Sequence, residues 1–374
     1  MSKHSRFGYS STLNSIQSKK IIRRDICSGF VSINNALKPP TLSAEEKQSR
    51  WQSNQPIYLP SICKNSLQDY QVPLSTSRSL YEAALADKPI DDILDKSPYI
   101  DQLGQRFQLL SSRVDAADPQ EIVSLDFDVM DGEELLYEDI WIRISWLSFH
   151  ESDASLRFRF SFGMENYDDV SSDPERQVEA AELCQAIFPE SSILSHNEEI
   201  QKEVQSIAGL EKFRFVERIV YFNAPNGGAQ FHHDAEKGHA GVCYVQLTGE
   251  TFWLSLSLSE LINEVIEFLN ERENFDNVTD LFGETIKNEC QRYVESPAIL
   301  SNAIKDPYNE NIGLILNECP LFFKHLVERN YAYHLKPGDG ILLPQESIDQ
   351  CAWHSVFSFS EEAGEALSFA IKKT

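Results

Sequence analysis

The sequence has no apolar run approaching the roughly 20 residues that a membrane-spanning helix requires, and its start lacks the charged-then-apolar pattern of a secretory signal. These two absences favour a soluble, cytoplasmic protein, which is the expectation here. The seven cysteines are odd in number and never fall in a CxxC pair. A disulfide framework and a zinc knuckle are therefore both disfavoured.

Positive charge is also scarce, with 33 Lys and Arg residues against 58 Asp and Glu and a formal net charge of -25. Such a chain repels a phosphate backbone unless a local basic patch opposes it, so nucleic acid is not an expected partner. The start of the chain is the exception, because ten basic residues stand against three acidic ones up to Lys64. The basic, Ser-rich, aperiodic composition of the first twenty residues is typical of a flexible tail, and 1–66 is assigned as a basic, flexible N-terminal segment.

Apolar residues at helical spacing between positions 79 and 110 predict short helices that are interrupted at Pro89 and Pro98. We therefore assign 67–135 to a helical support region. Strand signals begin near position 122 and strengthen over 140–149 and 156–162, which read as a hairpin with its turn at 151–155.

In the second strand of this hairpin, leucine and phenylalanine side chains alternate with Arg157, Arg159 and Ser161. The arginine face is expected to be solvated, and a surface that binds an anionic ligand is the alternative. A helix is predicted over 174–188, and strands resume over 213–223 and 230–256.

The spacing of apolar residues changes again between positions 257 and 331, where apolar pairs recur at helical spacing. This stretch is predicted to be a helical insertion. The end of the chain returns to strands, at 331–334, 340–343, 354–359 and 367–372, and we expect these strands to pair with those of 213–256 in one barrel.

One short motif carries chemistry, at Phe231-His232-His233-Asp234. Side chains alternate along a strand, so His232 and Asp234 project to one face while His233 projects to the other. That spacing presents an imidazole and a carboxylate to one metal ion. A third ligand on a neighbouring strand would complete a facial triad of two histidines and one carboxylate, and His354 is the best placed candidate.

Three stretches together resemble the cupin-type Fe(II)- and 2-oxoglutarate-dependent oxygenases, and the JmjC-like hydroxylases most closely. They are 231–234, then 244–249 with Trp253, and 336–344 with Trp353 and His354. The resemblance implies an α+β, mainly β fold. In it a double-stranded β-helix, or jelly-roll (cupin) barrel, follows the helical N-terminal support and forms a catalytic domain over 136–374 with the helical insertion at 257–331.

The same resemblance implies that His232, Asp234 and His354 bind Fe(II) and that 2-oxoglutarate is the cosubstrate. The chain would then be a dioxygenase that hydroxylates a protein side chain, an amino acid or a small metabolite. A carboxylate ligand at Asp234 favours hydroxylation or desaturation over halogenation, because halogenating relatives have a small residue there.

The residues expected to bind the cosubstrate depart from the JmjC-like pattern. Those enzymes usually carry a lysine just after the glycine matched by Gly249, where this sequence has Glu250. Other families of the superfamily place the cation on the strand after the distal histidine, where Lys372 lies. Arg218 is a second candidate, Tyr244 is expected to hydrogen-bond the cosubstrate, and a solvated Lys372 near the end of the chain is the alternative.

Two other functions stay open. One is a cupin metalloenzyme that uses the triad without 2-oxoglutarate, which the missing lysine favours, and the other is a non-catalytic barrel that binds a partner. A bulge in this segment would let Glu236 or His239 replace a ligand. The insertion lies between the two metal-binding motifs, so it would form either a lid over a small-molecule or peptide substrate or the surface of a homodimer.

Overall fold

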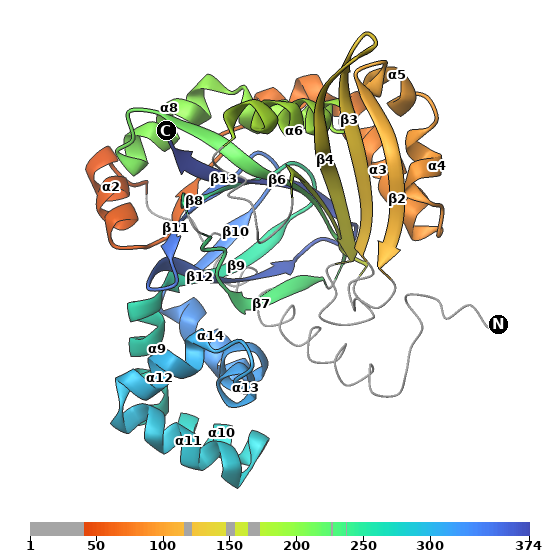
Figure 1. Ribbon diagram of the computed structural model, residues 1–374. Helices are drawn as coiled ribbons and strands as arrows, with labels where there is room; N and C mark the ends of the chain where they lie inside the picture. The colour runs from red at the N-terminus through yellow and green to blue at the C-terminus, as the bar shows by residue number, and fades with distance from the viewer. Residues whose placement is uncertain (1–40, 116–121, 147–153, 164–172, 226, 237) are drawn as a thin grey trace, which may run out of the picture.

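A large antiparallel sheet dominates the computed structural model, which describes residues 41–115, 122–146, 154–163, 173–225, 227–236 and 238–374. Its strands follow the order β10-β9-β12-β11-β8-β13-β6-β5-β4-β3-β2, and helices cover its outer faces (Figure 1). The described chain is therefore a mixed helix-and-sheet protein, as the sequence predicts.

The strands are β1 (Ile57–Leu59), β2 (Phe107–Asp115), β3 (Ile122–Asp131), β4 (Glu134–Trp146), β5 (Leu156–Phe162), β6 (Phe213–Asn223), β7 (Gly228–His232), β8 (His239–Gln246), β9 (Thr251–Ser257), β10 (Ala332–Leu335), β11 (Gly340–Ser347), β12 (Gln350–Ser358) and β13 (Gly364–Lys373). The helices before β6 are α2 (Ala44–Gln52), η1 (Ser66–Tyr70), α3 (Gln71–Leu85), α4 (Ile90–Leu94), α5 (Tyr99–Leu103), α6 (Pro174–Ile187), η2 (Pro189–Ser191), α7 (Ser192–Ser195) and α8 (Glu198–Ala208). Between β9 and β10 lie α9 (Leu258–Asn270), α10 (Arg272–Phe282), α11 (Glu284–Glu295), α12 (Pro297–Lys305), α13 (Glu310–Glu318) and α14 (Pro320–Glu328).

The last eight strands form two layers that share an interior. In the first layer β6, β13, β8 and β11 pair in that order, and in the second β7, β12, β9 and β10 do so. Tyr244 of the first layer packs against Trp253 of the second, with ring centroids 4.7 Å apart, inside a buried cluster drawn from both layers. The predicted pairing of the C-terminal strands with 213–256 is confirmed.

Helices before β6 cover the outer face of the first layer. Their buried residues form one hydrophobic cluster with the sheet residues that point away from the second layer, among them Val220, Phe222 and Phe369. Pro89 and Pro98 stand at the N-caps of α4 and α5, where proline is tolerated because no helical N–H is lost. The predicted helix at 174–188 is α6, and Asp173 caps it by accepting from two backbone N–H groups.

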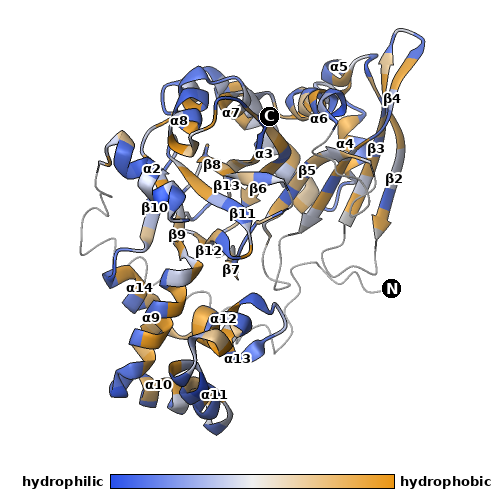
Figure 2. Cartoon of the chain, turned by 60° about the vertical axis from the view of Figure 1, so that its left-hand side comes forward, coloured by the Kyte–Doolittle hydropathy of each residue, from blue (hydrophilic) through white to orange (hydrophobic). Residues whose placement is uncertain are grey.

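The interval 257–331 holds six consecutive helices. Ser257 ends β9 and caps α9 through a reciprocal capping box with Glu260, so the strand passes directly into the first helix. Figure 2 shows hydrophobic residues running through this bundle, and they form one cluster with the outer face of the second layer. The bundle thus packs on the strands through apolar residues.

Two parts of the predicted organisation are wrong. The region 67–135 is not wholly helical, because β2 and β3 extend the large sheet; a register shift between Leu109 and Ser111 of β2 breaks the alternation by which a strand is recognised. The segment 1–66 is also structured from Ser43 onward, because β1 pairs with β11 and buries Ile57 and Leu59. Residues 1–40 lie outside the described residues.

The hairpin of β4 and β5 is confirmed, with Arg143 opposite Arg159 and Ser145 opposite Arg157. Its predicted turn at 151–155 falls largely outside the described residues. Six cysteines can be placed, and all six are free and buried. Within the described ranges no helix has both the length and the apolar composition needed to cross a bilayer.

Two carboxyl groups are buried together beneath the helical layer. Glu190, in η2, and Glu365, at the start of β13, are 0% and 2% exposed, and the Ser77 hydroxyl donates to Glu365 Oε2 at 2.6 Å. Burial raises the pKa of both groups, and the neighbouring Glu190 raises that of Glu365 further. An acid whose pKa is raised by folding stays protonated to a higher pH in the folded chain than in the unfolded chain.

We therefore expect the free energy of unfolding to fall as pH rises from the ordinary glutamate range toward the raised pKa. Glu365→Gln should flatten this dependence and stabilise the protein above neutral pH, since each tenfold preference for the protonated form is worth about 1.4 kcal/mol. Urea unfolding of both proteins between pH 5 and pH 8 measures the effect. If the free energy of unfolding depended on pH in the same way in both proteins, the pKa of Glu365 would not change on folding.

Candidate metal centre

The metal-binding motif begins on β7, whose side chains alternate between two environments. Phe231 points into the hydrophobic cluster shared with the helical insertion, whereas His232 points into the interior between the two layers. The strand ends at His232, and Asp234 follows two residues later on the same side. His233 points the other way and packs against the Trp353 ring at 5.0 Å, as the alternation predicts.

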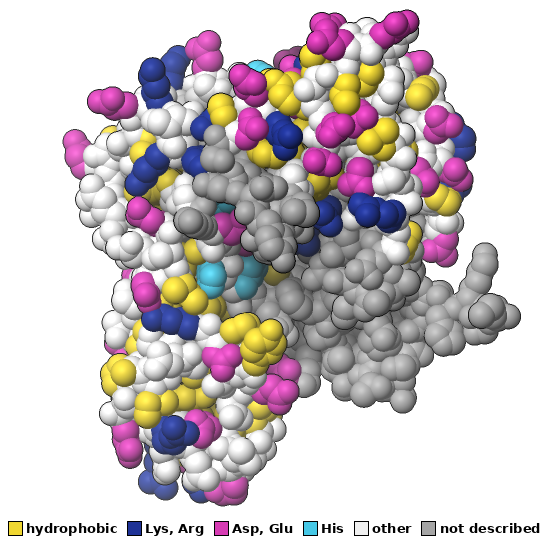
Figure 3. All heavy atoms as spheres, in the orientation of Figure 1, with side chains coloured by type: hydrophobic (Ala, Val, Ile, Leu, Met, Phe, Trp, Pro, Cys, Tyr) yellow, Lys and Arg dark blue, Asp and Glu magenta, His cyan; other side chains and the backbone are white. Residues whose placement is uncertain are grey.

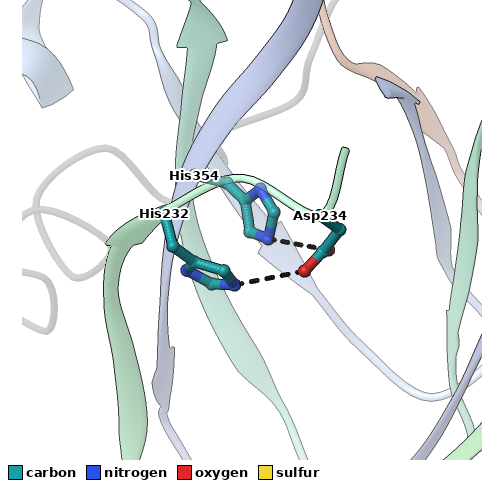
Figure 4. A group of neighbouring side chains, drawn as sticks. All are labelled: His232, Asp234 and His354. Carbon is teal, nitrogen blue, oxygen red and sulfur yellow. Dashed lines mark ion pairs between the residues drawn. The ribbon is translucent and has the colours of Figure 1, made fainter. Parts of the chain in front are cut away.

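The third residue comes from β12, which pairs with β7. His354 lies opposite His232 in the register, and their ring centroids are 4.2 Å apart. One donor atom from each of His232, Asp234 and His354 lies within 4.8 Å of the others. Figure 4 shows the three side chains converging, with the Nε2 atoms of His232 and His354 at 3.6 Å and 3.4 Å from the Asp234 oxygens.

Backbone carbonyl groups fix the orientation of both imidazoles. Nδ1 of His232 lies 2.7 Å from the Gln230 oxygen, and Nδ1 of His354 lies 3.2 Å from the Ala352 oxygen. A hydrogen on each Nδ1 satisfies these contacts and leaves Nε2 with a lone pair. Metal-binding histidines are commonly held by such a second hydrogen bond, which sets the tautomer and the ring direction.

The protonation states also suit a metal. Burial, together with the neighbouring His354, lowers the pKa of His232 to about 4, so His232 is neutral at ordinary pH. Burial opposes ionisation of Asp234, yet the two histidines hold its pKa below the ordinary range. Two imidazoles and one carboxylate are the donor set of non-haem Fe(II) sites, so these residues fit such an ion.

A buried glutamine ties the two metal-binding strands together. Gln345 on β11 is fully buried; its side-chain oxygen accepts from the Asp234 backbone N–H at 3.1 Å, and its amide nitrogen donates to the Ala352 oxygen at 2.9 Å. Asp234 lies just beyond the end of β7, so this contact takes the place of a strand partner. Gln345 is not recognisable as part of the site from the sequence, because its only local signal is a polar residue inside an apolar strand.

A cavity of about 180 Å³ adjoins the three residues, between the two layers. Its other polar lining comes mainly from the first layer and β5, namely Ser155, Arg157, Tyr221, Asn223, Tyr244 and Ser368. Figure 3 shows histidine side chains at the surface between the strand-rich part and the insertion, and about a third of the His232 side chain is exposed. A small molecule entering the cavity can therefore reach the metal-binding group.

Of the three residues predicted to bind a cosubstrate, only Tyr244 lines this cavity. Arg218 lies on the opposite face of β6, where its guanidinium carbon is 5.6 Å from the Phe369 ring centroid and Nη1 donates to the Gln177 oxygen on α6. Along β6, Arg218 lies on the same side as Val220, which packs against the helices, and not on the side of Tyr221, which lines the cavity. The prediction for Arg218 is therefore wrong.

Lys372 is likewise not part of the cavity lining, because it lies near the end of β13 beside Arg214 and His239 in the register. Glu250, which stands where JmjC-like enzymes carry a lysine, pairs with His334 at 2.7 Å. The alternative ligands Glu236 and His239 do not join the group of three.

Among the described residues, the cation that lines the cavity is Arg157, on β5. This strand pairs with β6 so that Arg157 lies opposite Tyr221, and the arginine face of β5 continues the inner face of the first layer. Nε of Arg157 donates to the Ser145 hydroxyl at 3.2 Å. The alternation along β5 indicates an arginine face, but only the pairing with β6 turns that face toward the metal-binding group.

No protein-family model matches the sequence, and the search of curated proteins found no match. Among solved structures, two of YcfD, a ribosomal oxygenase from Escherichia coli, are 11% and 12% identical over 89% of this chain, with a TM-score of 0.30. The chain covers 52% and 54% of those YcfD chains, so it spans about half of their length.

A third structure is an oxidoreductase of the 2OG-Fe(II) oxygenase family from Burkholderia pseudomallei. It is 9% identical, with 90% of this chain and 93% of that chain covered and a TM-score of 0.30. Likeness at this level decides neither fold nor function. The metal-binding group itself therefore carries the functional proposal.

Proposed function

We propose that the chain is a non-haem Fe(II)- and 2-oxoglutarate-dependent dioxygenase. The observation that carries the proposal is the convergence of His232, Asp234 and His354 at one end of an accessible cavity. Two imidazoles and one carboxylate leave the remaining positions of an octahedral ion for ligands from solution. Hydroxylation of a protein side chain, an amino acid or a small metabolite is the proposed reaction.

The proposed barrel is a double-stranded β-helix formed by β6 to β13. Its support is the pairing order, in which strands alternate between the two layers on either side of the insertion. The chain crosses from layer to layer, so residues from β7 and β12 meet at the interior end of one cavity. A rigid layered scaffold of this kind holds ligands from distant parts of the sequence.

When bound, Fe(II) would supply the oxidation chemistry, with decarboxylation of 2-oxoglutarate as the coupled reaction. The protein's part is to hold the ion, orient the cosubstrate and limit access of water. Tyr244 hydrogen-bonds to Gln246 and to Asn223, and Thr251 donates to the same Gln246 oxygen. This network gives the cavity wall a fixed set of neutral polar groups.

Arg157 is proposed to bind the carboxylate of 2-oxoglutarate that lies away from the metal. A divalent ion held by two neutral histidines and one carboxylate retains one positive charge, and Arg157 adds a second. A dianion that reaches from the ion to Arg157 balances both, whereas a buried carboxylate without a cation is costly. The Tyr221 phenol interacts with both sides of the cavity: burial and Asp234 raise its pKa and Arg157 lowers it, for a net pKa of about 12.

The proposed activity is tested by the coupled decarboxylation. Purified protein with Fe(II), oxygen and 2-oxoglutarate should release carbon dioxide and succinate in equal amounts, slowly even without the true substrate. Metal binding without any decarboxylation would favour the cupin metalloenzyme that does not use 2-oxoglutarate. A protein that binds no metal and keeps its stability would favour a non-catalytic barrel.

A further inference from the structure

The helical insertion lies behind the metal site, on the side away from the cavity. Its buried residues form one cluster with Phe231 on β7, Leu254 on β9 and Phe357 on β12, all on the outer face of the second layer. Within the described residues, none from α9 to α14 lines the cavity. The contact of the insertion with the metal site therefore runs through the backs of the strands.

One contact is polar and reaches the strand that bears His232. The backbone N–H of Phe231 donates to the side-chain oxygen of Asn317 on α13 at 2.7 Å. Asn317 is 6% exposed, so this bond is shielded from water. The bond holds the Gln230–Phe231 peptide, which lies one peptide before His232 and whose carbonyl oxygen contacts Nδ1 of that ligand.

Strand β7 is short and, among the described strands, pairs with β12 alone. It spans only five residues, and its pairing has a register shift between His354 and Val356. The free edge of a strand exposes N–H groups that need partners when buried. Asn317 supplies that partner from the insertion, while Gln345 holds Asp234 from the barrel.

We propose that Asn317 is a positioning residue of the metal site and that the helical insertion serves, through it, to hold β7 in the geometry that metal binding needs. This inference rests on the metal site but not on the use of 2-oxoglutarate. Loss of an outer partner of a metal ligand typically weakens metal binding by about 10- to 100-fold. Asn317 acts one peptide away from His232, so the lower end of that range is expected.

The test uses Co(II) alone, a probe whose visible spectrum reports ligand geometry. Asn317→Leu keeps the approximate size of the side chain but removes the acceptor, and it should weaken Co(II) binding about tenfold and change the visible spectrum. Asn317→Asp keeps an acceptor and should restore both. The matched control is Asn309→Ala, which removes the N-cap of the same helix, where Asn309 accepts from the Ile312 N–H at 3.2 Å.

Asn309→Ala should lower the melting temperature yet leave the Co(II) affinity and spectrum as in the unmodified protein. A folded Asn317→Leu protein with unchanged affinity and spectrum would overturn the proposal. If that variant does not fold, hydrogen exchange of the unmodified, metal-free protein decides the matter. The backbone amide hydrogen of Phe231 should then exchange slowly. If it exchanged as fast as that of an exposed amide, the proposal would equally be overturned.

Discussion

Replacing any one of His232, Asp234 and His354 with alanine is expected to remove most metal binding. Each supplies one of three converging donors, so its loss should cost more than the roughly 10- to 100-fold that follows loss of an outer partner. The cost to folding should be small for Asp234, whose side chain is 40% exposed, and larger for the buried His354. Equilibrium dialysis against Fe(II) under nitrogen measures the binding.

The matched control for these variants is His233→Ala. His233 is adjacent to both ligands in the sequence but packs against Trp353 on the other side of the strand. The His233→Ala protein should therefore bind one equivalent of Fe(II), as the unmodified protein does. If His354→Ala kept that equivalent at unchanged affinity, the triad would be wrong, since a two-residue site on one strand would then suffice.

Replacing Arg157 with glutamine should weaken 2-oxoglutarate binding by roughly 10- to 100-fold, because a hydrogen bond to a charged group contributes about 1.5–3 kcal/mol. Metal affinity should not change. Anaerobic titration of the Fe(II) protein with 2-oxoglutarate measures the loss. Arg157→Lys should recover only part of the affinity, since lysine keeps the charge without the planar pair of donors.

Two comparisons make this prediction specific. Arg143 lies one strand away on the same face, opposite Arg159, and is not part of the cavity lining, so Arg143→Gln should bind 2-oxoglutarate normally. The second comparison is 2-oxobutyrate, which has the oxo acid end but no outer carboxylate. Arg157→Gln should bind both acids about equally, and a retained preference for 2-oxoglutarate would mean that another group binds the outer carboxylate.

The metal ligands could be predicted from the sequence because their signal is local. His232 and Asp234 are two residues apart, and alternation alone places them on one face. His354 needed the further expectation that the C-terminal strands return beside the motif, which their turns and alternation support. The distance of 122 positions between His232 and His354 is closed by the register of β7 and β12.

The cosubstrate residues could not be predicted in the same way, because their placement depends on which strand neighbours which. Arg218 lies on β6, a strand that lines the cavity, but its side chain faces the helices. Lys372 lies near the end of β13 and is not part of the cavity lining. The face that carries Arg157 is expected from the sequence to be solvated, with a surface that binds an anionic ligand as the alternative, and solvation would hold for an outer hairpin. Because β5 pairs with β6, that face becomes part of the interior, and no local pattern encodes such a pairing.

The contacts that hold the ligands were also beyond local reasoning. Gln345 and Asn317 act through backbone groups of residues 111 and 86 positions away. A single buried amide in an apolar strand or helix gives no indication of its partner. Tertiary packing alone decides whether it completes a ligand's surroundings or fills the core.

The most direct test of the central claim is an anaerobic titration of the Fe(II)-loaded protein with 2-oxoglutarate, followed by visible absorption. The proposed site predicts one Fe(II) per chain and a weak charge-transfer band that saturates at one equivalent of 2-oxoglutarate and is absent from Asp234→Ala. A folded protein that binds Fe(II) but develops no band with 2-oxoglutarate would contradict the account.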